Sequence, residues 1–448
     1  MAGIAGILKE GKQELVSKMI ETISHRGNYG KTILEKEGAT IGMVWSKHEE
    51  PRLTEKLRKD IFCDGPGFGQ MVQISRMNGN WEIFRDELGV SPMYSAENQE
   101  GDLCFASEIK AIADVSTRIY EVLPGHITTQ TLRKKYFHLD ARPSFPESPE
   151  VIARELFNLL SLSVTSRINS GNMGSWLSGG LDSSAIAVLA RPWLTTFHTF
   201  AAGVQGAPDL NYARFMSSHL GSIHHEIIVD LLEMLRVLPL VIYHLESFDA
   251  LLVRSSIINY LVAKEASEYV EEVFSGEGGD EFFAGYEYLK QIPEAELDRE
   301  LVDISSRLHN TALQRVDRCA SAHGLTAHVV FADPHFFEFA LRIPILYKLM
   351  DGIEKWILRK AMEDVLPKEI TWRPKAKFWE GAGVGELISK YASVKVTDND
   401  FMSERHLKND WILNTKEELF YYRIFKDHFG QLENLDWMGR TKGSPKSN

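Results

Sequence analysis

Hydrophobic positions in roughly the first third of the chain fall in short segments separated by turns. Apolar and polar residues alternate at 71–75 and 81–84, on either side of Met77-Asn78-Gly79-Asn80, a sequence typical of a two-residue hairpin turn. Further strands are expected at 3–8, 40–45, 103–106 and 126–129, and a helix at 14–23. Residues 47–60 are charged and are expected to be exposed. The pattern predicts a β-rich N-terminal domain over residues 1–140.

A different pattern begins after the Pro- and Ser-rich segment 141–149, which is typical of a linker. Strands are expected at 173–177, 196–202, 226–229 and 270–275, and helices at 152–165, 185–190, 209–220, 231–245, 254–264 and 417–429. Strands that alternate with helices predict a parallel α/β sheet. Asp209 is expected to cap its helix. The second domain is expected over residues 150–435, followed by a polar tail at 436–448 whose end, from Gly439, is expected to be disordered.

Composition narrows the class of protein. The chain has 448 residues, enough for two domains with sizeable cores. A net charge of −12 and a pI near 5.7 argue against nucleic acid as the main partner. Cys63, Cys104 and Cys319 form no CxxC pair and indicate neither a zinc site nor a disulfide framework. Because no apolar run approaches the roughly 18 residues of a membrane span, we expect a cytoplasmic protein with no membrane partner.

The most informative segment is the string Ser178-Gly179-Gly180-Leu181-Asp182-Ser183-Ser184, between a predicted strand and a predicted helix. Its glycines allow a ligand to approach the backbone closely, and its hydroxyls join the first N–H groups of the helix in an anion cradle. Asp182 would repel a phosphate unless a cation lay between them, which points to Mg²⁺. The spacing is not that of a Walker A loop.

A second loop, Ser275-Gly276-Glu277-Gly278-Gly279-Asp280-Glu281, follows another predicted strand. Ligands of doubly wound sheets bind at the carboxyl ends of the strands, so the two loops are expected to face each other. Asp280 is expected to join Asp182 in holding Mg²⁺ between phosphates. Glu277 is then free to act as a general base or to orient an amine.

The first loop resembles the pyrophosphate loop of ATP pyrophosphatases, and the second is very similar to a string of asparagine synthetases. Other strings similar to that family are Arg315-x-Asp317-Arg318, Lys355-x-Ile357-Leu358-Arg359 and Arg373-Pro374-Lys375-x-x-Phe378. The opening A-G-I-A-G-I, His25-Arg26-Gly27 and Arg85-Asp86-x-x-Gly89 resemble its glutamine-hydrolysing N-terminal domain. The resemblance implies an α/β protein with a degenerate class II amidotransferase-like domain of the N-terminal-nucleophile type before an adenine nucleotide α-hydrolase-like domain.

The resemblance also implies roles for particular residues. Lys375 would be the catalytic cation for departing pyrophosphate, beside Glu277. Asp249 and Arg254 would bind the substrate, with Gly278 and Asp280, and adenine would pack near Phe200. The residues assigned to ATP are Leu177, Ser178, Gly179, Gly180, Asp182, Ser183, Ser184, Phe200, Gly203, Ser275 and Gly276.

This chain departs from the family at three places. Ala2 stands where the family has a nucleophilic cysteine, and nothing between Trp45 and Met71 matches the family's Asn-Gly-Glu oxyanion loop, so glutaminase activity is not expected. Thr326 and His328 replace a Glu and an Arg of the family, which suggests a changed substrate or weakened activity. Leu251 and Leu252 replace two threonines of the aspartate pocket, which is consistent with a more apolar substrate or with lineage drift.

These observations predict an ATP- and Mg²⁺-dependent synthetase that adenylates a carboxylic acid, releases pyrophosphate and amidates with ammonia or a substrate amine. Asparagine formation from aspartate is the leading reaction. Intramolecular amide closure, as in β-lactam synthetases, is an alternative, and a non-catalytic nucleotide- or partner-binding protein is another. The sequence leaves open a homodimer and the identity of the acid.

Overall fold

Two antiparallel sheets make up most of the N-terminal domain in a computed structural model that describes residues 1–374, 385–407 and 411–442. The first sheet has the strand order β2-β3-β1-β8-β7-β9, and the second β11-β10-β6-β5-β4. The strands are β1 (Gly3–Ile7), β2 (Gly30–Lys36), β3 (Ala39–Trp45), β4 (Phe62–Gly67), β5 (Gln70–Met77), β6 (Asn80–Arg85), β7 (Tyr94–Glu97), β8 (Leu103–Ala106), β9 (Ile119–Glu121), β10 (His126–Thr128) and β11 (Arg133–Lys135).

Alternating side chains from the two sheets form one buried cluster. Ile4 and Ile41 of the first sheet pack with Val72 and Ile83 of the second. Helix α1 (Gln13–Thr22) lies against the first sheet through an apolar stripe that contains Val16. The β-rich architecture was therefore predicted correctly, whereas the assignment of this domain to the N-terminal-nucleophile type stays a prediction.

The hairpin between β5 and β6 forms as expected. Met77 pairs with Asn80, and Asn78 and Gly79 adopt φ angles of 51° and 86°, as a tight two-residue turn requires. Residues 47–60, expected to be exposed, contain helix α2 (Glu50–Leu57), and Glu49 and Leu53 among them are buried. Leu57, one turn after Leu53, is partly buried against the same cluster, but two apolar positions are too few to give a clear helical period in the sequence.

The second domain is built on a five-stranded parallel sheet with the order β14-β13-β12-β15-β16. Its strands are β12 (Asn172–Trp176), β13 (Thr196–Gly203), β14 (Ile223–Ile228), β15 (Glu272–Ser275) and β16 (Thr326–Val329). A small hairpin of β17 (Leu349–Met350) and β18 (Ile353–Glu354) lies apart from it. The predicted α/β class with a parallel sheet is confirmed.

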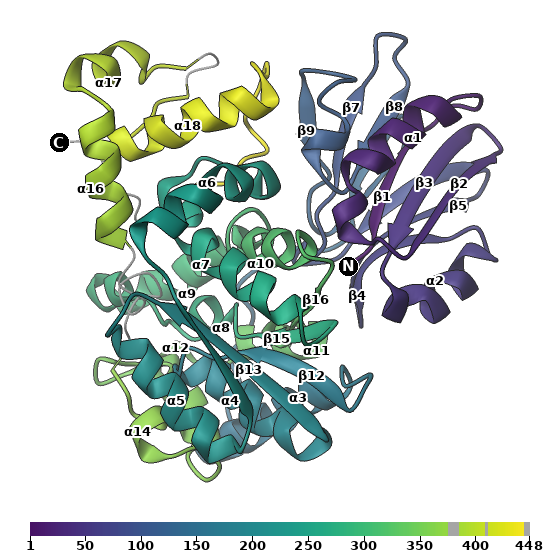
Figure 1. Cartoon of the computed structure of the whole chain (residues 1–448). Helices are drawn as coiled ribbons and strands as arrows, with labels where there is room; N and C mark the ends of the chain where they lie inside the picture. The colour runs from purple at the N-terminus through teal and green to yellow at the C-terminus, as the bar shows by residue number, and fades with distance from the viewer. Residues whose placement is uncertain (375–384, 408–410, 443–448) are drawn as a thin grey trace.

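Helices surround the parallel sheet and extend beyond it, as Figure 1 shows. They are α3 (Pro149–Thr165), α4 (Leu181–Ala190), α5 (Pro208–Leu220), α6 (Leu231–Leu245), α7 (Ala250–Ser267), α8 (Gly279–Phe282), α9 (Glu294–Ser306), α10 (Ala312–Ser321), α11 (Pro334–Leu341), α12 (Ile345–Lys348), α13 (Trp356–Met362), α14 (Lys368–Thr371), α16 (Gly385–Lys395), α17 (Asp398–Glu404) and α18 (Lys416–Phe429). Asp209 does not cap α5 as expected; the N-cap position is Ala207, and Asp209 lies in the first turn.

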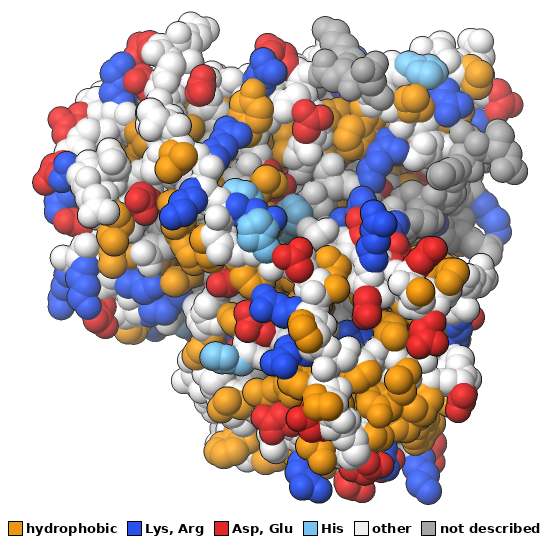
Figure 2. Space-filling model, turned by 180° about the vertical axis from the view of Figure 1, so that it is seen from behind, with side chains coloured by type: hydrophobic (Ala, Val, Ile, Leu, Met, Phe, Trp, Pro, Cys, Tyr) orange, Lys and Arg blue, Asp and Glu red, His pale blue; other side chains and the backbone are white. Residues whose placement is uncertain are grey.

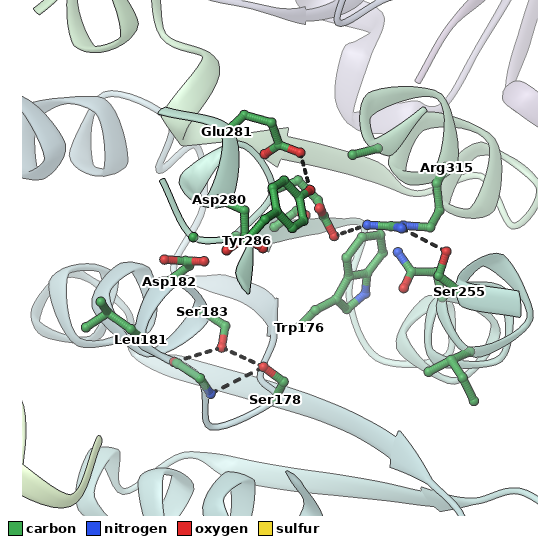
Figure 3. A pocket seen from close by; sticks show the side chains of 18 of the residues that line it. Trp176, Ser178, Leu181, Asp182, Ser183, Ser255, Asp280, Glu281, Tyr286 and Arg315 are labelled. Atoms are coloured by element: carbon green, nitrogen blue, oxygen red, sulfur yellow. Dashed lines mark hydrogen bonds and ion pairs between the residues drawn. The ribbon is translucent and has the colours of Figure 1, made fainter. Parts of the chain in front are cut away.

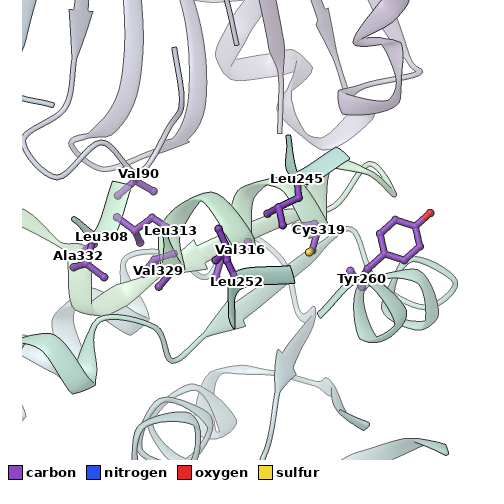
Figure 4. Close-up of a cluster of buried hydrophobic side chains, with 14 of the residues drawn as sticks. Val90, Leu245, Leu252, Tyr260, Leu308, Leu313, Val316, Cys319, Val329 and Ala332 are labelled. Atoms are coloured by element: carbon purple, nitrogen blue, oxygen red, sulfur yellow. The ribbon is translucent and has the colours of Figure 1, made fainter. Parts of the chain in front are cut away.

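A buried network of charges joins the two domains. Arg26 of the N-terminal domain makes a bidentate pair with Asp317 on α10, with N–O distances of 2.9 and 3.0 Å. The same guanidinium reaches Glu108 at 2.8 Å and Asp64 at 3.1 Å. An apolar contact accompanies it, because Val90 of the N-terminal domain lies beside Leu308 in the core of the second domain (Figure 4).

The C-terminal segment is packed rather than free over its described part. Trp437 and Met438 are buried in the main core, and Asn434 exchanges hydrogen bonds with the backbone of Ile119. The expectation of disorder from Gly439 is not met by residues 439–442, because Arg440 pairs with Glu418 and Thr441 donates two hydrogen bonds to Asp249. Residues 443–448 lie outside the described residues.

Charged side chains of both signs are interspersed on the face in Figure 2, with hydrophobic side chains gathered on its lower lobe. Within the described residues, no helix has the length and apolar character needed to cross a bilayer.

Candidate active site

Two loops meet at the carboxyl edge of the parallel sheet. The first follows β12 and enters α4, and the second follows β15 and enters α8. They are in direct contact, because a Cβ atom added to Gly279 would lie 2.6 Å from the carboxyl carbon of Asp182. The strands are neighbours in the sheet, so the sequence prediction that these loops face each other is confirmed.

The first loop has the shape of an anion cradle. Gly179 has φ +68°, and a Cβ there would lie 2.4 Å from the backbone of Tyr212 on α5, so only glycine fits. The hydroxyl of Ser178 accepts a hydrogen bond from the Gly180 amide at 3.3 Å and lies 3.2 Å from the hydroxyl of Ser183 (Figure 3). The first N–H groups of α4 have no acceptor within the helix and remain available to a phosphate.

Lys355 lies between the two carboxylates that were predicted to hold a metal. Its ammonium is ion-paired with Asp182 and lies 2.5 Å from Asp280. Burial favours the neutral amine, but the two carboxylates outweigh it and raise the pKa of Lys355 above its ordinary value. Lys355 has φ +57°, uncommon for a residue with a side chain, and Gly285 leaves the space its stem occupies.

The oxygen atoms at this cluster suit a hard cation. The Oδ1 atom of Asp182 is buried and has no hydrogen-bond partner, which is costly unless a ligand supplies one. Carboxylate oxygens that converge beside an anion cradle match the ligand preference of Mg²⁺. No group of three or more His, Cys, Asp or Glu is arranged to hold a metal within the described residues, so the remaining ligands would come from phosphates and water.

Glu277 is held in a buried hydrogen-bonded chain. Its Oε1 accepts a hydrogen bond of 2.5 Å from Arg315, which also donates to the Ser255 hydroxyl at 2.8 Å (Figure 3). Burial lowers the pKa of Arg315, and Glu277 more than restores it, so the guanidinium stays charged. The carboxylate of Glu277 is partly exposed and lines the cavity described below.

Glu281 sits deeper in the same loop. It accepts a hydrogen bond of 2.5 Å from the hydroxyl of Tyr286. Burial, reinforced by Asp280, raises the pKa of Glu281 to about 7. The three carboxyl groups of the second loop therefore have different partners: a guanidinium for Glu277, an ammonium for Asp280 and a phenol for Glu281.

Both loops open onto a cavity of about 1050 Å³, at the upper end of the range of roughly 300–1,000 Å³ that holds drug-sized ligands. One face of α7 forms a wall, and Arg373, Arg440 and Lys442 reach the cavity from the C-terminal third of the chain. The residues predicted to bind nucleotide, substrate or metal that line it are Leu177, Ser178, Gly180, Asp182, Ser183, Phe200, Ser275, Gly276, Glu277 and Asp280.

Phe200, near which adenine was predicted to pack, lines the cavity. Its ring is 1% exposed, stacks on His225 with a centroid separation of 4.8 Å and packs over Gly174. A contact between adenine and this ring stays a prediction. Gly179, Ser184, Gly203 and Gly278 do not line the cavity, although each lies in or beside an element that does.

Asp249 and Arg254, predicted to bind substrate, are engaged elsewhere. Asp249 caps α7 by accepting from the Leu252 amide at 2.9 Å, and it also accepts from the Thr441 hydroxyl at 2.8 Å. Arg254 pairs with Glu417 on α18 through a bond of 2.7 Å. Neither residue lines the cavity, whereas Leu251 and Leu252 between them do.

Thr326 and His328 do not line the cavity. Thr326 is the first residue of β16, so it lies at the amino edge of the parallel sheet, opposite the loops. Its hydroxyl is 2.9 Å from His48 of the N-terminal domain, whereas His328 pairs with Glu272 of its own domain at 2.7 Å. A changed substrate or a weakened activity as the result of these replacements stays a prediction.

Sequence reasoning missed Lys355, although the string that contains it had been noted. Nothing in the sequence places it near the loops, because α13 comes more than seventy residues after the second loop. Its left-handed backbone conformation is a signal that only a structure supplies. Lys375, the predicted catalytic cation, lies outside the described residues.

Comparison with known proteins agrees with this geometry. A family model described as asparagine synthase matches residues 155–299 and 291–443. Asparagine synthetase B (glutamine-hydrolysing) of Escherichia coli K12 is 34% identical over 455 aligned residues, covering 96% of this chain and 81% of the relative. A glutamine-hydrolysing asparagine synthetase of Sandersonia aurantiaca is 30% identical, covering 82% of this chain and 75% of the relative.

A solved structure of NMN synthetase from Francisella tularensis matches with a TM-score of 0.29 and 14% identity, covering 66% of this chain and 100% of the other. A score at that level adds nothing to the fold described above.

Proposed function

This chain belongs to the asparagine synthase family, and on that premise we propose that it is an ATP-dependent amide-forming ligase. The observation that carries the proposal is the contact between the two loops, which brings an anion cradle, paired carboxylates and a buried cation to one cavity. The acid is activated as an acyl-adenylate, because an oxide ion is too poor a leaving group for an amine to displace.

The triphosphate of ATP binds at the start of α4, between the hydroxyls of Ser178 and Ser183. The N–H groups there supply donors that are preorganised for the phosphate oxygens. Asp182 and Asp280 would hold Mg²⁺, which offsets the phosphate charge when bound. Lys355 is positioned to neutralise whichever of these anions is left without a partner.

The first chemical step forms one bond and breaks one. An oxygen of the substrate carboxylate attacks the α-phosphorus of ATP, and the bond between that phosphorus and the bridging oxygen breaks. Pyrophosphate leaves with the electron pair and is stabilised by Lys355, with Lys375 as a second cation from the family resemblance. The product retained in the cavity is the mixed anhydride of the acid and AMP.

The second step is attack of an amine nitrogen on the acyl carbon. The nitrogen gives up a proton to Glu277, and AMP leaves as the amide forms. Arg315 and Ser255 fix the orientation of the Glu277 carboxylate, so the base presents one oxygen to the cavity. Preorganisation of this kind avoids the entropy cost of aligning the base during the reaction.

The nitrogen comes from ammonia or from an amine of the substrate itself. Ala2 has no nucleophilic atom and is fully buried, with its carbonyl accepting a hydrogen bond of 2.7 Å from Arg26. The names of the relatives give aspartate amidation as one reaction to test, and an intramolecular amide closure is the other. Product mass separates them, because ring closure incorporates no added nitrogen.

Exchange of radiolabelled pyrophosphate into ATP over a panel of carboxylic acids tests the proposal directly. Acid-dependent exchange is expected for the wild type, and its loss is expected for Asp182→Asn. Pyrophosphate release should be supported by ammonium and not by glutamine in ammonia-free buffer. Nucleotide binding without exchange for any acid would instead support a non-catalytic binding protein.

A further inference from the structure

The wall of the cavity formed by α7 is apolar where a substrate would lie beside Glu277. Leu251, Leu252, Ile258 and Val262 recur on the cavity side of this helix at helical spacing. Ser255 belongs to the same face, but its hydroxyl already bonds to Arg315 and to the backbone of Leu251. Asn259 lies on the same face and adds one amide to it. Four of the six residues of α7 that line the cavity are nevertheless apolar, so the largest part of this wall offers methyl groups rather than hydrogen-bonding groups.

The cationic side chains that line the cavity are paired already within the described residues. Lys355 is paired with Asp182 and Asp280, and Arg315 with Glu277, as described above. Arg373 is paired with Asp209. The remaining pairs are Arg307 with Asp303 at 3.0 Å, Arg359 with Glu354 at 2.5 Å, Arg440 with Glu418 at 3.1 Å and Lys442 with Glu300 at 2.6 Å.

The C-terminal segment also engages the predicted substrate-binding residues of α7. The amide and hydroxyl of Thr441 both donate to Asp249, and Tyr421 donates to the Glu417 carboxylate that holds Arg254. Asp249 and Arg254 thus serve the junction of α7 with α18 and the C-terminal segment. Both side chains are therefore engaged in contacts within the protein when no substrate is bound.

A dicarboxylic amino acid is poorly matched to the described part of this site. Its unreacting carboxylate needs a cation or several donors once it leaves water, because a buried charge without a partner is strongly unfavourable. Taking a cation from an existing pair would leave one of the protein's own carboxylates unpaired instead. An acid with one carboxylate and an apolar body needs no partner for a second carboxylate and breaks no existing ion pair. Its binding is also favoured by apolar contact with the leucines.

We infer that the acid activated by this chain is a monocarboxylate with an apolar body that lies against Leu251 and Leu252, rather than a dicarboxylic amino acid. The inference rests on the proposed function, since it names the substrate class of that reaction. On this inference the two leucines determine substrate specificity, at a site whose phosphate-binding loop resembles that of the family.

Pyrophosphate exchange with matched acids tests this inference on the full-length wild-type chain. Pentanoate and pentanedioate have the same carbon chain and differ by one carboxylate, and L-aspartate and branched apolar acids complete the panel. Apolar monocarboxylates are expected to support exchange at least about tenfold faster than pentanedioate or aspartate, because the second charge must be desolvated. Equal or faster exchange with aspartate overturns the inference while supporting the ligase. Exchange with no acid overturns the ligase and the inference together.

Variants of the wall give a second measurement. The double change Leu251→Thr with Leu252→Thr should lower exchange with pentanoate at least about tenfold relative to aspartate, because hydroxyls replace the methyl contacts. Leu232→Thr, at a residue that is 77% exposed on α6, is the matched control and should change nothing. If the double variant does not fold, Leu251→Phe replaces it and should shift the preference to shorter apolar acids. An unchanged preference in the folded variant overturns the inference.

Discussion

The network around Arg26 and the cluster around Lys355 each place a cation among several buried carboxylates. Around Arg26, the guanidinium donates to Asp64, Glu108 and Asp317, and none of these groups is open to solvent. Around Lys355, the pair of carboxylates borders a cavity, and one oxygen of Asp182 lacks a hydrogen-bond partner. The fully hydrogen-bonded network around Arg26 holds the two domains together. The cluster around Lys355 still has a carboxylate oxygen that a ligand could contact.

The geometry of the two cations supports this difference. A guanidinium is planar and offers five donors in a fixed arrangement, so it can satisfy several fixed carboxylates at once. An ammonium on a flexible stem can follow whichever anion needs it. The molecule thus uses arginine where the arrangement is permanent and lysine where phosphates are expected to come and go.

Removal of the interdomain cation should have the largest effect. Arg26→Met leaves three buried carboxylates without their shared partner and should lower the free energy of unfolding by about 3–5 kcal/mol. Urea denaturation followed by circular dichroism measures this loss. Arg58→Met, at an exposed residue of the same domain, is the control and should stay within about 0.5 kcal/mol of the wild type. A similar stability for both variants would contradict a structural role for the network.

Removal of the cavity cation should act on the reaction instead. Lys355→Met should lower the rate of pyrophosphate release by about 10²–10³, because the departing anion loses one preorganised partner. Lys360→Met removes a lysine from the same helix that pairs with Glu363 near the surface, and should leave the rate unchanged. Pyrophosphate release per folded molecule is the measurement. A rate within twofold of the wild type for Lys355→Met would show that this lysine only maintains structure.

The interdomain network also predicts a pH dependence of stability. Burial raises the pKa of Asp64 from 3.8 to about 6, although Arg26 opposes the shift. The folded pKa is above the unfolded one, so the contribution of Asp64 is fully present below pH 3.8 and is lost as the pH rises through about 6. Asp64→Asn should abolish this loss, which amounts to at most about 3 kcal/mol.

Unfolding free energies at several pH values between 4 and 8 measure the difference between Asp64→Asn and the wild type. Asp114→Asn, at an exposed carboxylate of the same domain, is the control and should parallel the wild type. Parallel curves for both variants would refute the assignment to Asp64.

The smallest effect on the reaction is expected at His328 on β16, which does not line the cavity. His328→Gln breaks the pair with Glu272 at 2.7 Å but touches neither loop. The KM for the acid should change by less than about twofold, while stability falls by about 1–3 kcal/mol. A large change in KM without a change in stability would place His328 in the substrate pocket after all.

The sequence predicted the features of the site that follow from the succession of strands along the chain. The two loops could be placed together because both follow strands of a parallel sheet, whose carboxyl ends share one edge. The sequence did not predict contacts between segments that are far apart along the chain. Lys355 reaches the site from the start of α13, far along the chain. Asp249 and Arg254 are the same residue types as in the family, but Asp249 is bonded to Thr441 and Arg254 to Glu417 of α18.

Thr326 shows a second limit of the sequence. A string that resembles the family's does not say how far a residue lies from the ligand, and Thr326 begins β16 at the amino edge of the parallel sheet, away from the loops. Its hydroxyl lies 2.9 Å from His48 of the N-terminal domain. A resemblance that is read residue by residue does not place a side chain relative to a ligand.

The network around Arg26 has a consequence for how the two domains depend on each other during biosynthesis. Cut apart in the linker at 141–149, the second domain would expose Asp317 and Arg318 together with the apolar surface that Val90 covers. Such a surface promotes aggregation of a newly made domain. The N-terminal domain therefore covers charged and apolar surface that the second domain would otherwise expose.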